Sequence, residues 1–143
     1  MTIARVLAGK PSATIYTATA DMTVQDVVQI LAERRFGAVP VVEGDRLVGI
    51  ISERDLIYCA AREGGAALAR PVREVMTAEP ITVSPNVSVL EALALMTQKR
   101  VRHLPIVEDG RLTGFISIGD LVKHRIDAIE AEAEAMRNYI QAN

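Results

Sequence analysis

The chain has 143 residues, of which 50% are hydrophobic but only 3% aromatic, and it carries a formal net charge of −2. This length supports a core of aliphatic side chains, while the acidic balance and the scarcity of aromatic rings argue against nucleic acid as a partner. No stretch is apolar enough to span a membrane, the single Cys59 excludes an internal disulfide, and no signal-peptide pattern is present, so we expect a cytoplasmic protein.

The first half of the chain predicts the order strand, helix, strand, strand, helix. Thr23 and Ser52 are each followed three residues later by an aspartate, which is typical of a helix-starting capping box. Gly37 lies just beyond the predicted end of the first of these helices, where a glycine often ends a helix. In chain order we expect a helical turn at 2–7, a strand or extended segment at 15–18, a helix from Thr23 to about Arg35, a hairpin of strands 39–42 and 47–51, and a helix from Ser52.

The second half repeats this pattern without a gap. Pro105 follows Pro40 by 65 residues (105 − 40 = 65), and GAVPVVEGDRLVGIISERDL returns at that offset as RHLPIVEDGRLTGFISIGDL. We therefore expect a strand at 81–83, a helix from Ser88, strands at 104–107 and 112–116, and a helix from Ser117. Neither copy alone would bury much of its sheet, so the predicted fold is α/β (α+β), with the two copies packed face to face in pseudo-two-fold symmetry.

The predicted boundaries are a first repeat at 3–62, a linker at 63–71, a second repeat at 72–125 and a helical extension at 126–143. The last helix carries an apolar stripe with alternating spacings of four and three, formed by Val122, Ile126, Ile129, Ala133, Met136 and Ile140. Such a stripe packs either on its own domain or on the helix of a partner chain, and the pattern does not separate the two.

The pattern Gly-h-h-Ser-x-x-Asp, where h is hydrophobic, occurs in both copies. Its serine begins a helix, whose backbone N–H groups suit an anion, and its aspartate can accept hydrogen bonds from the two hydroxyls of a ribose. The simpler interpretation is that each Ser-x-x-Asp only caps its helix. The motif occupies residues 49–55 and 114–120.

A proline-containing strand entrance precedes each hairpin and predicts extended backbone. Ala38 and Val39 lie before Pro40, and His103 and Leu104 lie before Pro105. Such backbone can pair with the edge of a planar base. Arg102 and His103 lie directly ahead of the second entrance, and a guanidinium there suits a phosphate.

Both copies resemble CBS domains, named after cystathionine β-synthase, and the pair resembles a Bateman module. VREVMTAEPITVSP resembles the opening segment of the family, KRVRHLPIV its central strand, and GFISIGDLV its closing strand and helix. The resemblance covers nearly the whole chain. It implies a homodimeric regulatory module that binds AMP, ADP or ATP, or else NAD or S-adenosylmethionine, in clefts between the two copies and signals to a regulated protein.

The resemblance also implies which residues meet the ligand. Asp55 and Asp120 match the ribose-binding aspartate, and Ser52 and Ser117 the hydroxyl residue of the same motif. The remaining matches are Ala38, Val39, His103 and Leu104 at the adenine, Tyr16 and Ile81 as apolar neighbours of the base, Thr77 as a polar neighbour, and Arg54, Arg102 and His103 at the phosphates.

The first copy departs from the family pattern, because Gly37 and Ala38 replace the Arg102–His103 pair. On that basis we expect Asp120→Ala to weaken nucleotide binding more than Asp55→Ala. Lys10 is a further candidate for a charge near the first copy.

No catalytic or metal-binding constellation is recognisable in the sequence. Cys59 lies in a predicted helix, where we expect it to belong to the core. The sequence thus predicts a binding module rather than an enzyme. The alternative is a constitutive interaction scaffold whose pockets are vestigial.

Overall fold

The computed structural model describes residues 1–10 and 15–142. No helix in the described part of the chain is long and apolar enough to cross a membrane. The elements are α1 (Ile3–Ala8), β1 (Ala18–Thr19), α2 (Val24–Arg34), β2 (Ala38–Glu43), β3 (Arg46–Ser52), α3 (Glu53–Glu63), the 3-10 helix η1 (Gly64–Ala69), α4 (Val72–Val75), β4 (Thr77–Ala78), α5 (Val89–Lys99), β5 (His103–Glu108), β6 (Arg111–Ser117) and α6 (Ile118–Ala142).

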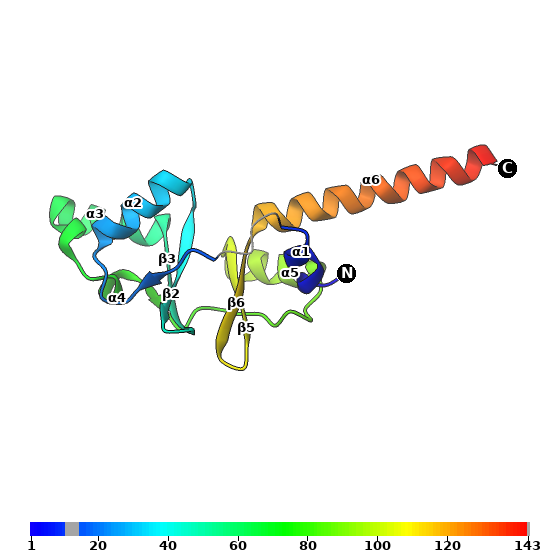
Figure 1. Ribbon diagram of the computed structural model, residues 1–143. Coiled ribbons are helices and arrows are strands. Elements are labelled where there is room, and N and C mark those ends of the chain that lie inside the picture. Colours follow the sequence, from blue (N-terminus) through cyan, green and yellow to red (C-terminus); the bar gives the residue numbers. More distant parts are fainter. Residues whose placement is uncertain (11–14, 143) are drawn as a thin grey trace.

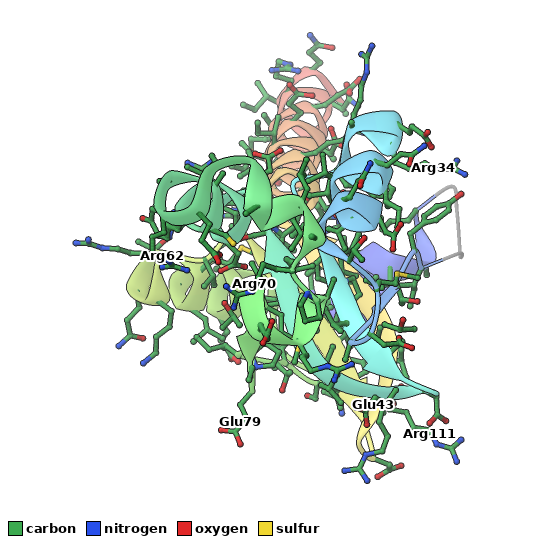
Figure 2. The ribbon with its side chains drawn as sticks, turned by 90° about the vertical axis from the view of Figure 1, so that its left-hand side faces the viewer. Arg34, Glu43, Arg62, Arg70, Glu79 and Arg111 are labelled. Atoms are coloured by element: carbon green, nitrogen blue, oxygen red, sulfur yellow. The ribbon has the colours of Figure 1, made fainter. Side chains whose placement is uncertain are left out.

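The two hairpins, β2–β3 and β5–β6, form the centre of the molecule, and the helices lie on its outer sides (Figure 1). The strand order is β1-β2-β3-β6-β5, with β4 paired to β3. The hairpins meet near their turns, where Arg46 pairs with Arg111 and the Leu112 N–H donates to the Asp45 carbonyl over 3.0 Å. Glu43 and Arg111 lie at this same end of the molecule (Figure 2). The predicted mixed fold of two repeats is confirmed.

Each repeat has its own hydrophobic core, and each core is completed by a segment that precedes the other repeat. Ile3 and Val6 of α1 pack into the core of the second repeat. Val72 of α4 packs into the core of the first, and its N–H donates to the Met22 carbonyl over 2.8 Å. The exchange buries apolar side chains of both short helices, and it ties the repeats together.

The predicted helix starts are confirmed. Thr23 and Ser52 each accept a hydrogen bond from the backbone N–H three residues later, and the aspartate at that position accepts from the capping residue's own N–H. Ser88 caps α5 through the Glu91 N–H. These bonds satisfy N–H groups that have no partner within the helix.

The short strands differ from the prediction. Of the strand or extended segment expected at 15–18, only Ala18 is paired, in the two-residue β1. The strand expected at 81–83 is wrong: Val83 makes a single bridge to Ile106, because Pro80 and Pro85 flank the segment and lack backbone donors. Helix α2 ends at Arg34, as predicted, and Arg35 rather than Gly37 takes the left-handed conformation there, with φ 56°.

The region between the repeats is more regular than a loop. Helix α3 extends to Glu63 and continues as η1. Cys59 is fully buried, as predicted, and its Sγ donates to Glu63 Oε2 over 3.1 Å. This hydrogen bond to a carboxylate, together with burial, raises the pKa of the thiol and makes it unreactive.

Helix α6 leaves the body of the molecule and points away from it (Figure 1). Of its residues, only Leu121 is fully buried. The five large side chains of the predicted stripe, Val122, Ile126, Ile129, Met136 and Ile140, are between 43% and 66% exposed. The stripe therefore does not pack on its own domain.

Candidate functional site: two clefts between the repeats

Two clefts of about 640 and 530 Å³ lie between the repeats. Both volumes are within the range of small-molecule sites. The larger, here called the Asp120 cleft, combines Tyr16, Ala38 and Val39 with Ser117 and Asp120. The smaller, called the Asp55 cleft, combines Ser52, Arg54, Asp55 and Thr77 with Ile81 and Arg102. Each cleft thus joins the helix start of one repeat to the strand entrance of the other.

Asp120 is held at the start of α6. Its Oδ2 accepts hydrogen bonds from the Ser117 N–H over 2.9 Å and from Lys10 Nζ over 3.0 Å. Burial favours the neutral carboxyl, but these hydrogen bonds and the positive charge of Lys10 prevail and lower the pKa of Asp120. The group is an anion at neutral pH, and Lys10 also donates to the Phe115 carbonyl over 3.3 Å.

Asp55 has a different environment. Its Oδ2 accepts from the Ser52 N–H over 2.9 Å, and its Oδ1 accepts from the Thr77 hydroxyl over 3.2 Å. Both of these partners are neutral donors, whereas the carboxylate of Asp120 also accepts from the charged Lys10. Three arginines line the Asp55 cleft, Arg54, Arg100 and Arg102, together with Glu53 and Glu79.

Glycines in the motif allow other segments to reach the clefts. A Cβ on Gly49 would lie 2.5 Å from Met76 Sδ and 2.9 Å from the Thr77 carbonyl oxygen. Glycine therefore lets β4 pair with β3 and brings the Thr77 hydroxyl to Asp55. A Cβ on Gly114 would lie 2.7 Å from Leu7 Cδ1, so that glycine makes room for α1.

His103 lies between the two clefts and lines both. Its ring stacks on Phe115, with centroids 5.4 Å apart and planes inclined by 9°. Gly37 faces it, because a Cβ there would be 3.2 Å from His103 Cε1. Burial lowers the pKa of His103, although the carboxylates of Asp120 and Glu53 oppose the shift. His103 is therefore neutral at pH 7.

This lowered pKa predicts a pH dependence of stability. The unfolded chain binds a proton near pH 6.5 and the folded chain only at lower pH, so the free energy of unfolding falls as the pH drops below about 6.5. We expect His103→Gln to remove this component. Urea denaturation of both proteins at pH 7.5, 6.5 and 5.5 tests it, and parallel pH profiles would rule the effect out.

The strand entrance of the first repeat presents backbone to the Asp120 cleft. β1 pairs only with Val41 and Val42, so beside Ala38 and Val39 the outer edge of β2 has no strand partner among the described residues. An extended edge of this kind offers N–H and C=O groups to a planar ligand. Tyr16 lies nearby, with its ring 5.5 Å from that of Phe36 and 4.5 Å from the Arg34 guanidinium carbon.

The structure brings all the predicted site residues except Leu104 to one of the two clefts. Leu104 is fully buried in the core of the second repeat. Arg102 lines the Asp55 cleft and not the Asp120 cleft, so the argument that ranked Asp120 above Asp55 through Arg102 is wrong. The error came from assigning one pocket to each copy, whereas each pocket takes residues from both.

Several cleft residues were not predicted. Phe115 and Ile50 precede the fully buried Ile116 and Ile51 in their strands. Alternation along a strand was the signal that could have placed them opposite the core. Arg100 is the left-handed residue that ends α5, and its signal was its place among the basic residues Lys99, Arg100 and Arg102. No group of three or more His, Cys, Asp and Glu side chains among residues 1–10 and 15–142 is placed to hold a metal ion.

Curated relatives cover nearly all of the chain. The mitochondrial CBS domain-containing protein CBSX3 of Arabidopsis thaliana is 38% identical over 86% of this chain, which spans 62% of that relative. The CBS domain-containing protein YhcV of Bacillus subtilis is 32% identical, over 90% of this chain and 91% of its own length.

Solved structures of CBS-domain proteins have the same fold as this chain. A protein with CBS domains from Burkholderia ambifaria is 43% identical, covers 89% of this chain and 95% of its own, and superposes with a TM-score of 0.83. CBSX2 in complex with AMP superposes with a TM-score of 0.77 at 22% identity, and covers 88% of this chain and 97% of its own. The CBS domain pair of MJ0100, in complex with 5′-methylthioadenosine and S-adenosylmethionine, superposes with a TM-score of 0.75 at 22% identity, and covers 86% of this chain and 98% of its own. The CBS domain family matches residues 8–62 and 72–127, and with both repeats matched the chain belongs to that family as a tandem pair.

Proposed function

We propose that this chain is a regulatory module that binds an adenine nucleotide in the two clefts between its repeats. The observation that carries the proposal is the composition of each cleft. In each cleft a carboxylate at a helix start can accept hydrogen bonds from ribose hydroxyls, and the backbone of a strand entrance can pair with the edge of a base. The cationic side chains of the cleft can bind a phosphate. CBSX2 was solved with AMP, and MJ0100 with two other adenosine compounds, which supports the ligand class.

In the Asp120 cleft, we propose that the base lies against the edge of β2 beside Ala38 and Val39. The ribose hydroxyls donate to Asp120, and Lys10 moves from the carboxylate to the phosphate. In the Asp55 cleft, Asp55 holds the ribose, while Arg54 and Arg102 meet the phosphates. Ile81 takes the place that Tyr16 has in the other cleft, as the apolar neighbour of the base.

Regulation follows from the position of the clefts. A ligand that touches both repeats binds better to the relative placement of the repeats that fits it. Occupancy therefore shifts the population of shapes that a regulated protein, or a second copy of the chain, recognises. In this proposal the chain itself carries out no catalysis.

The proposal is tested by thermal unfolding of the purified chain with AMP, ADP, ATP, NAD, S-adenosylmethionine and GTP. A ligand at 100 times its dissociation constant adds about 2.7 kcal/mol, which raises the melting temperature by several degrees. We expect an increase with at least one adenine compound and none with GTP. A flat response at millimolar concentrations would instead favour the constitutive scaffold.

A further inference from the structure

Helix α6 has an apolar face that its own chain leaves open. The stripe repeats every four and three residues from Val122 to Ile140, and its large members are 43–66% exposed. The distal part of the helix extends beyond the body (Figure 1). A protruding helix without tertiary packing is only marginally stable in water, so this face needs a partner. The alternating four-three spacing is that of a helix that packs along another helix.

The charged residues that flank the stripe restrict which partner helix can pack against it. If the stripe occupies the a and d positions of a heptad repeat, the flanking e positions are Lys123, Glu130 and Arg137, and the flanking g positions include Arg125 and Glu132. The signs alternate along each flank. Any partner helix must present the opposite order of signs to be stabilised.

A second copy of α6 satisfies this order when it runs parallel and in register. A g residue then lies opposite the e residue five positions later on the other helix. Arg125 faces Glu130 of the second copy, and Glu132 faces Arg137 of the second copy. By symmetry each attraction occurs twice, and all six stripe positions pack against their own equivalents.

Antiparallel arrangements fit less well. Full overlap of two antiparallel stripes places Glu130 and Glu132 opposite their own copies and Lys123 opposite Arg137, so like charges meet on both flanks. A shift by one heptad pairs Lys123 with Glu130 and Arg125 with Glu132, but it leaves Met136 and Ile140 outside the overlap. The exposed apolar face then remains partly uncovered.

We propose that α6 forms a parallel, in-register two-helix contact with α6 of a second copy of this chain. This contact places the two pairs of repeats at one end of the helical stem. It does not depend on nucleotide binding, so it stands or falls separately from the function proposed above.

The first test is the mass in solution, by sedimentation velocity of the full chain at 1–100 μM. We expect a dimer for the wild type and a monomer for Ile126→Asp with Ile129→Asp. Both isoleucines are 49% exposed in a single chain, so the repeats keep their fold, which circular dichroism and thermal unfolding check. A monomeric wild type, or a dimer that survives both substitutions, would overturn the proposal.

The second test reads the direction of the helices. Glu132→Arg alone places a positive charge against Arg137 of the second copy, and we expect the dimer to weaken about tenfold at low salt. Adding Arg137→Glu restores the attraction in the parallel dimer. In the shifted antiparallel register, the positive charge introduced by Glu132→Arg lies opposite Arg125 of the second copy. Adding Arg137→Glu does not remove that repulsion. Absence of this rescue would contradict the parallel arrangement.

Disulfide trapping gives an independent readout. In the parallel dimer, the thiol introduced by Ala133→Cys faces its own copy, so mild oxidation yields a covalent dimer. The wild type, whose single Cys59 is buried, is the control. If that thiol fails to cross-link with its own copy, or instead links to chains carrying Val122→Cys or Ile129→Cys, the parallel register is wrong.

Discussion

Asp120→Ala is expected to lower the affinity of the Asp120 cleft for AMP by about 100-fold. A ribose that donates two hydrogen bonds to a carboxylate gains about 3 kcal/mol, which this substitution removes. The substitution also frees Lys10, whose Nζ lies 3.0 Å from Asp120 Oδ2. The loss should therefore be larger for adenosine than for AMP, because only the nucleotide offers a phosphate to the released cation.

Isothermal titration with AMP and with adenosine measures both losses. The matched control is Asp26→Ala, which removes the equivalent capping box of α2 without touching either cleft. Both variants should lose about 1 kcal/mol of stability. If Asp26→Ala weakened AMP binding as much as Asp120→Ala, the aspartate would act only through helix capping. Equal losses for adenosine and AMP would rule out the role of Lys10.

Gly49→Ala is expected to destabilise the fold by about 2 kcal/mol, as overpacking in a filled site does. The added Cβ would collide with Met76 Sδ at 2.5 Å and the Thr77 carbonyl oxygen at 2.9 Å. Met76 can move aside, but the Thr77 backbone is held in β4 by its pairing with Ile50. Relief of the clash thus displaces the Thr77 hydroxyl from Asp55 and weakens the Asp55 cleft as well.

Urea denaturation measures the change in the free energy of unfolding. Gly65→Ala is the control, because no atom lies within 4 Å of the added Cβ and its φ is not positive. Gly114→Ala should cost less than Gly49→Ala, since its nearest obstacle is the tip of the Leu7 side chain. A Gly49→Ala protein within about 0.5 kcal/mol of the wild type would contradict this account of the motif glycine.

The fold was predictable because the repeat gave two independent views of each element. Both hairpins, the helix starts at Ser52 and Ser88, and the last helix follow from local patterns that tertiary packing does not override. The short strands were less predictable. Strand β4 forms only because Gly49 lets the chain approach β3, and Val83 pairs only through a long-range contact with Ile106.

The types of residue at the site were also predictable, but their grouping was not. The sequence order places Arg102 beside His103 and in the same copy as Asp120. In the folded chain each cleft takes residues from both repeats, and Arg102 lines the cleft of Asp55. The Lys10–Asp120 ion pair joins residues 110 positions apart, and no local pattern points to it.

The structure of the chain crystallised with saturating AMP tests the central claim most directly. We expect the adenine at the edge of β2 beside Ala38 and Val39, the ribose hydroxyls at hydrogen-bonding distance from Asp120, and Lys10 turned from that carboxylate to the phosphate. In an occupied Asp55 cleft, Asp55 and Arg102 take the corresponding roles. AMP bound elsewhere on the surface, or both clefts without AMP at saturation, would contradict the proposed function.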